Sequence, residues 1–373
     1  MTATTIEGHG AVVEAAGASI RIEPILIEPP GPGEVRVRLV ASGVCHSDHW
    51  AIRNGNWGAP FPMLLGHEGA GVIQDAGEGV QGMAPGDRVL LAWGVPCGVC
   101  RTCVRGAPRK CAHAWSQPSR LSRAGSGERL EGTLSLGTLA THTVVHAAQV
   151  IAVPDDADLS RVCLLGCGVS TGVGAALNTG RVWSGSTVAV VGLGGIGLAA
   201  LQGARIAGAA RLIAVDLVAA KLDLARSLGA TDVVDASRGD AAAVVRGLTG
   251  GVGVDVAIEA TGVPSVVGQV MAMLGSAGVG VAIGVPPPDS EVTLQWSGGP
   301  GAVYPNKSSL LVSDGGDALP KDFVTWLGWA VDGSLELDAI VSREASLTAE
   351  DIDEAFRAML AGEVVRTVIR IGS

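Results

Sequence analysis

The sequence predicts an α/β protein of two domains, one of which is built on a doubly wound parallel sheet. The chain has 373 residues, of which 47% are hydrophobic, and this is too long for one core of ordinary size. From about residue 186, short apolar runs alternate with helix-length segments, a pattern typical of parallel strands joined by crossover helices. A glycine-rich turn, GLGGIG at residues 192–197, follows the first of these runs.

The elements of the predicted parallel sheet follow one another in a regular order. The run STVAVVG reads as a buried parallel strand, and the segment LAALQGARIAGAA after the glycine-rich turn reads as a helix. The run RLIAVD then gives a second strand that ends at Asp216. Three further runs, DVVDA, VDVAIEATG and GVGVAIG, repeat the pattern at helix-length intervals. This order predicts a parallel sheet with helices on its faces.

The glycine-rich turn predicts a dinucleotide site. A GxGxxG pattern is weak by itself among 55 glycines, but here a strand precedes it, a helix follows it, and the acidic Asp216 ends the next strand about 20 residues on. Gly192 would allow the tight turn, Gly194 the close approach of a pyrophosphate, and Gly197 the packing of helix against strand. Asp216 would accept hydrogen bonds from the ribose hydroxyls and repel a 2′-phosphate, which predicts NAD rather than NADP.

Four of the seven cysteines lie close together in the run CGVCRTCVRGAPRKC. A cytoplasmic protein keeps its thiols reduced, and two-residue gaps gather sulfurs around one point more readily than they pair them. Four thiolates complete the tetrahedral shell of a Zn²⁺ ion, which makes such a site structural. We therefore expect a structural zinc loop at residues 97–111, with the ligands Cys97, Cys100, Cys103 and Cys111.

Three separate stretches supply candidate ligands for a second metal. Cys45 lies in GVCHSDHW, after the strand-like run EVRVRLV; His67 lies in LLGHEGAGVI and Cys167 in GCGVSTGVGAALN. Two thiolates and one imidazole leave the fourth position of Zn²⁺ open for water or substrate, so this set predicts a catalytic ion that stabilises an alkoxide. For Cys45 and His67 taken singly, the alternative is a small buried thiol and an ordinary buried histidine.

Other residues near these ligands have weaker signals. Asp48 and Glu68 lie beside or near a predicted ligand and are candidates to orient the imidazole and tune the metal. The alternative for either carboxylate is a solvated position in a loop. Cys163, in the apolar run VCLLG, is predicted to fill space in the core.

Charge and hydropathy argue against two classes of partner. The formal net charge is -10, and no basic run is longer than RGAPRK at residues 105–110, so we expect no nucleic-acid partner. The N-terminal stretch lacks a basic start followed by an apolar run, and no window offers about 18 apolar residues free of charges and glycine-rich turns. We expect a cytoplasmic protein that does not bind membranes.

Together these motifs resemble those of the zinc-containing medium-chain alcohol dehydrogenases, over nearly the whole chain. GVCHSD, GHEGAG, CxxCxxCx7C, GCGVSTG, GLGGIG, IAVD and the terminal GEVVRTVI occur in the order found in that family. The resemblance implies a GroES-like, β-rich catalytic domain at residues 1–168, a Rossmann NAD-binding domain at 169–311, and a return segment at 312–373 that completes the catalytic domain. It also implies an active site in the cleft between the two domains.

The resemblance implies roles for residues around the metal. Cys45, His67 and Cys167 would hold the catalytic zinc, and Ser47 would take the proton of the alcohol. Trp57 and Trp93 would line the substrate channel, where two indoles could narrow it to short primary alcohols or stack on an aromatic substrate. The alternative is that either tryptophan is an ordinary core residue.

It also implies contacts with the coenzyme. His46 and Arg366 would touch the pyrophosphate, Thr171 would lie near the nicotinamide, and Lys221 near the adenosine ribose. The alternative for Arg366 and Lys221 is a solvated surface cation. The full set of expected coenzyme contacts is His46, Thr171, Gly192, Gly194, Gly195, Ile196, Gly197, Asp216, Lys221, Val285 and Arg366.

Two features depart from the family pattern. Trp50 stands where many relatives carry the histidine that passes the proton to water, and His49 lies one place earlier. The residue that passes the proton from the relay to water is therefore not assigned from the sequence. Much of the segment from Pro286 to Lys321 does not match, and in relatives this region contributes to the subunit interface and to the rim of the substrate pocket. The identity of the substrate is therefore open as well.

The sequence thus predicts an NAD-dependent zinc enzyme that reversibly oxidises a primary or aromatic alcohol to the aldehyde. We expect two zinc ions per chain and a homodimer, with a tetramer as the alternative. One rival is a formaldehyde dehydrogenase acting on a glutathione or mycothiol adduct, with which the segment from Ser116 to Thr138 is compatible. Others are a reductase of imines or conjugated carbonyls in a biosynthetic pathway, and a zinc-stabilised, nucleotide-binding protein without catalysis.

Overall fold

The computed structural model describes residues 4–55, 60–94, 96–97, 99–105, 110–113, 118–287, 289–294 and 307–372. The chain folds as two compact units. Unit 1 comprises Met1–Cys167, Leu319–Gly333 and Ile340–Ser373, and unit 2 comprises Gly168–Ala318 and Ser334–Ala339. The domain bounds inferred from the sequence stay predictions.

Unit 2 contains a parallel sheet of six described strands in the order β13-β12-β11-β14-β15-β16. The chain builds outward from β11 to β13 and then returns to the other side of β11, so the topological switch point lies at the carboxyl ends of β11 and β14. The five apolar runs of the sequence form β11 to β15, which confirms the predicted doubly wound sheet. The strands are β11 (Thr187–Val191), β12 (Arg211–Asp216), β13 (Asp232–Asp235), β14 (Val254–Glu259), β15 (Leu274–Ala282) and β16 (Ser309–Val312).

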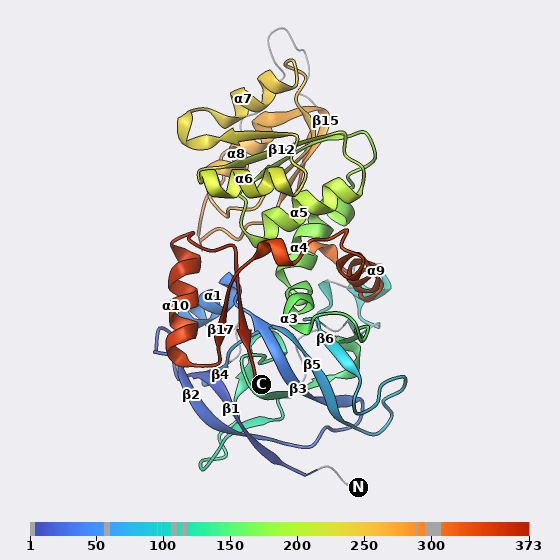
Figure 1. Ribbon diagram of the computed structural model, residues 1–373, viewed down its shortest axis with the longest axis vertical. Coiled ribbons are helices and arrows are strands. Elements are labelled where there is room, and N and C mark those ends of the chain that lie inside the picture. The colour runs from blue at the N-terminus through green and yellow to red at the C-terminus, as the bar shows by residue number, and fades with distance from the viewer. Residues whose placement is uncertain are drawn as a thin grey trace. The chain divides into compact units, whose positions relative to one another are not determined.

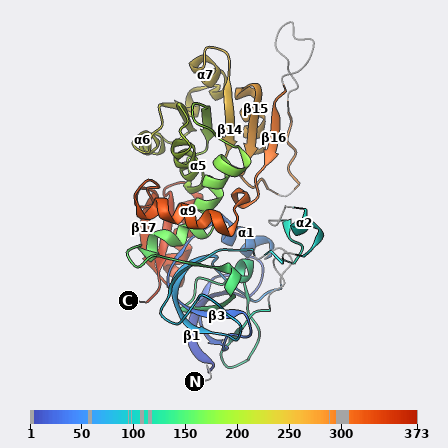
Figure 2. The same cartoon turned by 90° about the vertical axis from the view of Figure 1, so that its right-hand side faces the viewer.

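The helices α5, α6, α7 and α8 of unit 2 pack against this sheet (Figure 1). On one face, Val245 of α7 and Val270 of α8 join a buried apolar cluster with strand residues such as Ile213, and burial of such side chains is the main force that holds helix to sheet. Figure 2 shows β14, β15 and β16 side by side at one edge. The helices are α4 (Gly168–Gly174), which continues as a π-helical turn at Ala175–Thr179, α5 (Gly195–Ile206), α6 (Ala219–Ser227), α7 (Ala241–Leu248) and α8 (Pro264–Met273).

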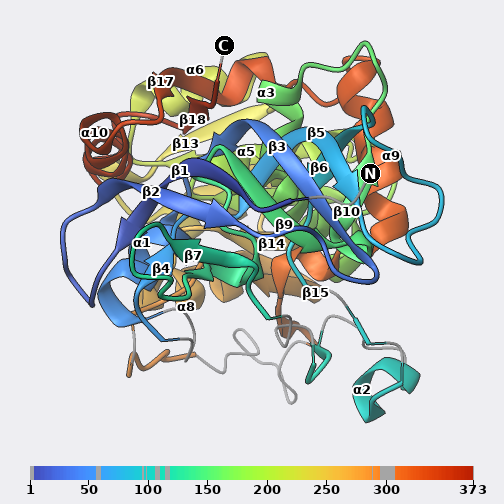
Figure 3. The same cartoon turned by 90° about the horizontal axis from the view of Figure 1, so that it is seen from below.

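Unit 1 contains two sheets, which Figure 3 shows from below. One has the order β7-β2-β1-β4-β8, and the other has the order β10-β6-β5-β3-β18-β17 with β9 also paired to β3. The end of the chain thus completes a sheet begun near its start, since β18 pairs with β3 in antiparallel register. The strands are β1 (Ile6–Val13), β2 (Arg21–Ile27), β3 (Glu34–Gly43), β4 (Met63–Leu64), β5 (Glu68–Ala76), β6 (Arg88–Leu91), β7 (Leu121–Arg123), β8 (Glu131–Gly132), β9 (His142–His146), β10 (Val150–Ala152), β17 (Val341–Ser346) and β18 (Arg366–Arg370).

The helix α10 shows why the return segment docks on unit 1. Its buried residues Ile352, Phe356 and Met359 recur at helical spacing, so they form one apolar stripe. This stripe joins the core cluster that contains Val37 of β3. The N-cap residue Thr348 accepts a hydrogen bond from a backbone amide in the first turn, which stabilises the start of the helix. The helices of unit 1 are α1 (His46–Asn54), α2 (Arg101–Val104), α3 (Leu159–Val162), α9 (Pro320–Val331) and α10 (Ala349–Leu360).

Among the described residues, each individual helix is too short or too polar to span a bilayer. One bent pair of helical segments, Leu159–Gly166 followed by Gly168–Thr179, meets the criterion by length and composition alone.

Candidate metal centres and dinucleotide site

Four buried side chains of unit 1 form the first candidate metal centre. Cys45 lies just before α1, His67 lies between β4 and β5, Glu68 begins β5, and Cys167 follows α3. Cys45 is 4% exposed and Cys167 7%, and His67 and Glu68 are fully buried. One ligand atom from each lies within 4.8 Å of the others. The structure therefore brings the three predicted catalytic ligands together and adds a carboxylate to them.

The orientation of the His67 ring suits a metal ligand. Oδ1 of the buried Asp48 lies 3.1 Å from His67 Nδ1 and accepts a 3.0 Å hydrogen bond from the Gly66 amide. The other ring nitrogen, Nε2, is buried and has no partner among the described residues. A proton held on Nδ1 by a carboxylate leaves the Nε2 lone pair free for a cation. Two sulfurs and this nitrogen are a donor set that Zn²⁺ prefers, so the residues fit the metal.

The turn before His67 requires glycine. Gly66 has a φ of +94°, a conformation that residues with a Cβ rarely adopt. A Cβ at this position would also lie 2.3 Å from the backbone nitrogen of Leu139. The GHE sequence is therefore what allows the chain to turn sharply and direct His67 into the cluster.

The two thiols of the cluster are coupled. The hydrogen bond from Cys167 lowers the pKa of Cys45 well below its usual value, against burial, which acts in the opposite direction. The same bond, together with burial, raises the pKa of Cys167. The pocket therefore favours one thiolate beside the imidazole, and a thiolate is the form of cysteine that binds metals.

Glu68 forms a buried ion pair with Arg366 of β18. Burial raises the pKa of Glu68 to about 7, against the opposing charge of the guanidinium. This pair was missed in the sequence because its members are 298 residues apart and no local pattern joins them. Arg366 thus lies beside the metal cluster, and its contact with a coenzyme pyrophosphate stays a prediction.

The second candidate centre is the four-cysteine loop. Cys97, Cys100, Cys103 and Cys111 each place a sulfur within 4.8 Å of the others, and all seven cysteines of the chain are free thiols in the described ranges. The hydroxyl of Thr102 is the main cause that lowers the pKa of Cys100 to about 5. Four sulfurs around one point with no disulfide match the predicted structural zinc site.

The glycine-rich turn of unit 2 has the shape that a dinucleotide needs. Gly192 has a φ of +91°, and a Cβ on Gly197 would lie 1.8 Å from the Gly192 carbonyl oxygen, whereas a Cβ on Gly194 would meet nothing within 4 Å. Gly194 caps α5 without any side-chain hydrogen bond, so the first amides of that helix are available to phosphate oxygens.

Asp216 is held against this turn. Its Oδ2 accepts a 2.6 Å hydrogen bond from the amide of Leu193, and its Oδ1 accepts a 2.9 Å bond from the amide of Val218. The carboxylate at the end of β12 is thus fixed beside the glycines, as the dinucleotide hypothesis requires.

The other predicted coenzyme contacts are distributed between the units. In unit 2, Lys221 lies in α6, Thr171 is buried in α4, and Val285 follows β15 with 76% of its surface exposed. His46, exposed at the start of α1, and Arg366 belong to unit 1. Their roles stay predictions.

Residues expected at the substrate and the proton relay lie in unit 1. Ser47 is half-buried in the first turn of α1, and Trp93 is half-buried against the core. Trp57 lies outside the described residues. His49 packs on Phe356 with ring centroids 6.0 Å apart, and burial lowers its pKa.

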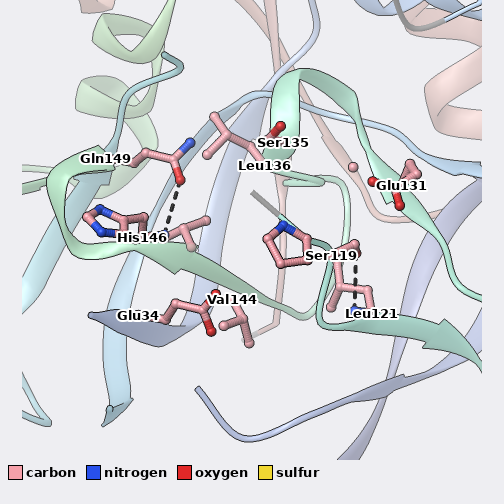
Figure 4. Close-up of a pocket in the computed structure, with 12 residues that line it drawn as sticks. Glu34, Ser119, Leu121, Glu131, Ser135, Leu136, Val144, His146 and Gln149 are labelled. Atoms are coloured by element: carbon pink, nitrogen blue, oxygen red, sulfur yellow. Dashed lines mark hydrogen bonds between the residues drawn. The ribbon is translucent and has the colours of Figure 1, made fainter. Parts of the chain in front are cut away.

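A small pocket of unit 1 is separate from these sites. It is bounded by residues that include Glu34, His146 and Gln149 (Figure 4), and its volume of about 20 Å³ has room for one water molecule. None of the predicted metal, substrate or coenzyme residues lines it, so it is not the candidate site.

Comparisons with known proteins identify two family models and a curated relative that match this chain. The sequence-family model for the alcohol dehydrogenase GroES-like domain matches residues 31–155. The sequence-family model for zinc-binding dehydrogenases matches residues 195–328. An alcohol dehydrogenase class-3 from Myxine glutinosa is 35% identical, with 100% of each chain covered.

Solved structures with the same fold are also similar in sequence. An alcohol dehydrogenase zinc-binding domain protein from Burkholderia ambifaria has a TM-score of 0.91 at 33% identity, covering 99% of this chain and 100% of the other. The benzyl alcohol dehydrogenase of Acinetobacter calcoaceticus has a TM-score of 0.87 at 29% identity, covering 98% and 100%. A zinc-binding dehydrogenase of Sinorhizobium meliloti 1021 bound to NADP has a TM-score of 0.80 at 28% identity, covering 98% and 99%.

Proposed function

The chain belongs to the zinc-containing medium-chain alcohol dehydrogenases, and we propose that within this family it reversibly oxidises a primary or aromatic alcohol to the aldehyde with NAD⁺. The family-model matches and the similar solved structure confirm the GroES-like and Rossmann fold classes that the sequence predicted. The observation that carries the proposal is the buried cluster of Cys45, His67 and Cys167, whose ligand atoms lie within 4.8 Å of one another.

The proposed chemistry divides between the bound groups and the side chains of the chain. Zinc held by Cys45, His67 and Cys167 would supply a Lewis acid that lowers the pKa of an alcohol, and NAD⁺ would supply the hydride acceptor. Oδ1 of Asp48 lies 3.1 Å from His67 Nδ1, and a carboxylate in this position favours the tautomer that leaves Nε2 for the metal. Ser47 is the proposed acceptor of the proton from the alcohol, and it lies two residues after Cys45 at the start of α1.

NAD is the proposed coenzyme because of Asp216. A negative charge fixed beside the glycine turn by the Leu193 amide accepts hydrogen bonds from ribose hydroxyls and repels a 2′-phosphate. A similar dehydrogenase from Sinorhizobium meliloti was solved with NADP bound, so the affinities of this protein for NADH and NADPH must be compared directly. We expect tighter binding of NADH than of NADPH, measured by fluorescence titration.

The substrate proposal includes aromatic alcohols because of Trp93 and because one similar structure is named as a benzyl alcohol dehydrogenase. A panel of ethanol, benzyl alcohol and formaldehyde, each with and without glutathione or mycothiol, tests it through the absorbance of NADH. Turnover of formaldehyde that appears only with a thiol would replace this proposal with a thiol-adduct dehydrogenase. If the indole of Trp93 narrows the channel, Trp93→Ala should raise kcat/KM for bulky alcohols.

Replacement of one ligand tests the metal site directly. In Cys45→Ala we expect loss of turnover and a fall in zinc content from about two ions to one, because one of three protein ligands is lost. Binding of NADH should survive. Cys163→Ala is the matched control, since Cys163 is a fully buried thiol outside the cluster and should keep both zinc ions. A metal-verified Cys45→Ala protein that still turns over alcohol would contradict the assigned role.

We propose a cytoplasmic homodimer. The support for a dimer is β16, which is the last described strand of its sheet and exposes 77% of Val312 and 40% of Leu311. An edge strand with free backbone groups and apolar side chains is suited to pairing with another chain.

A further inference from the structure

A buried carboxylate of unit 2 has no role in the function described so far. Glu259 is the last residue of β14 and is fully buried, yet no cationic side chain among the described residues pairs with it. Burial of a carboxylate is costly unless hydrogen bonds or a cation compensate for its lost hydration. Such a residue in the middle of a sheet therefore requires an explanation.

The compensation comes from the turn that follows the strand. Oε1 of Glu259 accepts three hydrogen bonds, from the Thr261 amide at 2.6 Å, the Thr261 hydroxyl at 2.5 Å and the Gly262 amide at 2.9 Å. Its Oε2 is buried and takes no hydrogen bond from the part of the chain that the structure describes. The carboxylate thus fixes the conformation of the Thr261–Gly262 turn.

This turn is packed against the glycine-rich turn after β11. A Cβ on Gly192 would lie 2.6 Å from Thr261 Cγ2 and 3.1 Å from the Ala260 carbonyl carbon. The amide of Ala260 also donates a 2.8 Å hydrogen bond to the carbonyl of Val191. The position of Thr261 therefore limits where Gly192 can lie.

The same turn is packed against the chain after β15. A Cβ on Gly284 would lie 2.0 Å from the Gly262 nitrogen, and a Cβ on Gly262 would lie 2.6 Å from the Val285 carbonyl oxygen. The Glu259 carbonyl accepts hydrogen bonds from the amides of Ile283 and Gly284. Three turns at the carboxyl edge of the sheet thus meet so closely that a Cβ added at Gly192, Gly262 or Gly284 would clash with a neighbouring turn.

We propose that Glu259 is a positioning residue of the dinucleotide site: its carboxylate holds the Thr261–Gly262 turn so that Gly192 and Val285 keep the conformation that binds the coenzyme. This inference rests on the proposed function. The carboxyl edge of a doubly wound sheet at its switch point is where such ligands bind, and a site loosened there binds less tightly even if every contact residue remains.

The test compares coenzyme binding in three variants of the full, zinc-loaded protein by NADH fluorescence titration. Glu259→Ala removes the acceptor of three hydrogen bonds, and we expect the Kd for NADH to rise about tenfold. Glu259→Gln keeps an amide oxygen for the same three donors and should bind within about threefold of the natural protein. In steady state the KM for NAD⁺ should rise in Glu259→Ala with little change in kcat.

Asp255→Ala is the matched control. Asp255 lies near the other end of the same strand and accepts a hydrogen bond from the Thr187 amide, so its loss should lower Tm without changing the Kd for NADH. If Glu259→Ala, like Asp255→Ala, lowers Tm but leaves the Kd for NADH unchanged, Glu259 is merely structural and the proposal is wrong. A Glu259→Gln protein that binds as weakly as Glu259→Ala would likewise overturn it, because the hydrogen bonds can still form in that variant.

Amide hydrogen exchange of the natural protein without coenzyme provides a second test that needs no variant. The amides of Thr261 and Gly262 should exchange slowly although Thr261 is exposed, because both donate to the buried carboxylate. Fast exchange would contradict the proposal. Failure of the natural protein to bind NADH and NADPH would instead contradict the proposed function, and the exchange measurement separates the two failures.

Discussion

At the scale of single residues, the candidate metal pocket includes a buried side chain, Asp48, that is not one of the proposed ligands. Asp48 accepts a hydrogen bond from Gly66 and holds Nδ1 of His67, and all of these groups are buried. Partners of this kind set the tautomer and the direction of a ligating imidazole. The contacts of Asp48 are those expected of an acid that orients the histidine, and this role is still a prediction.

Asp48→Asn tests this role. The amide can still accept from Gly66 but is a poorer acceptor for the His67 proton, so we expect zinc affinity and kcat/KM to fall by roughly 10- to 100-fold. Zinc affinity is measured by competition with a chromogenic chelator. Unchanged affinity in a folded variant would mean that Asp48 serves only the Gly66 turn.

His142 of β9 has a different effect, on stability. Burial, with the charges of Arg36 and Arg38, lowers its pKa to about 4, below the ordinary value near 6.5. The unfolded chain therefore binds a proton between pH 6.5 and pH 4 that the folded chain does not, and stability falls as pH falls through this window.

We expect the free energy of unfolding of His142→Gln to depend less on pH than that of the natural protein between about pH 6.5 and pH 4.5. Urea denaturation at several pH values measures this difference. Parallel curves for the two proteins would show that His142 does not titrate at a lowered pKa.

At the scale of elements, the short helix α2 of the four-cysteine loop lacks a core. It is four residues long and has no buried residue, so hydrophobic packing contributes little to holding this helix. A metal that joins four sulfurs can supply that stabilisation instead.

Replacement of a cysteine in this loop should therefore affect stability more than coenzyme binding. In Cys100→Ala we expect one zinc ion fewer per chain and a lower Tm, because three thiolates hold the ion less tightly. The Kd for NADH should stay within about threefold of the natural value. Retention of two zinc ions in this variant would contradict a four-sulfur site.

At the scale of the whole molecule, the edge strand β16 bears on assembly. Its exposed Val312 and Leu311 would be an aggregation hazard in a monomer. Val312→Lys places a charge on this edge, and we expect it to convert a dimer to a monomer in light scattering coupled to gel filtration. Thr348→Ala, which removes the α10 cap in unit 1, is the control that should stay dimeric. A dimeric Val312→Lys would place the interface elsewhere.

The sequence by itself determined the features that depend on neighbours along the chain. The strands β11 to β15, the glycine turn at Gly192 and the spacing of the four cysteines follow from local patterns of apolar residues, glycines and thiols. The donor chemistry of Cys45, His67 and Cys167 predicted one ligand set, and the resemblance of the motifs to one family implied the same set, although the three residues lie far apart in the sequence.

Only the tertiary structure decided which distant side chains share a buried environment. The pairing of Glu68 with Arg366 joins β5 to β18, and the packing of the Thr261–Gly262 turn against Gly192 depends on β14 lying beside β11 in the sheet. A buried charge must find a partner wherever the fold provides one, and the position of that partner is set by sheet pairing rather than by distance along the chain.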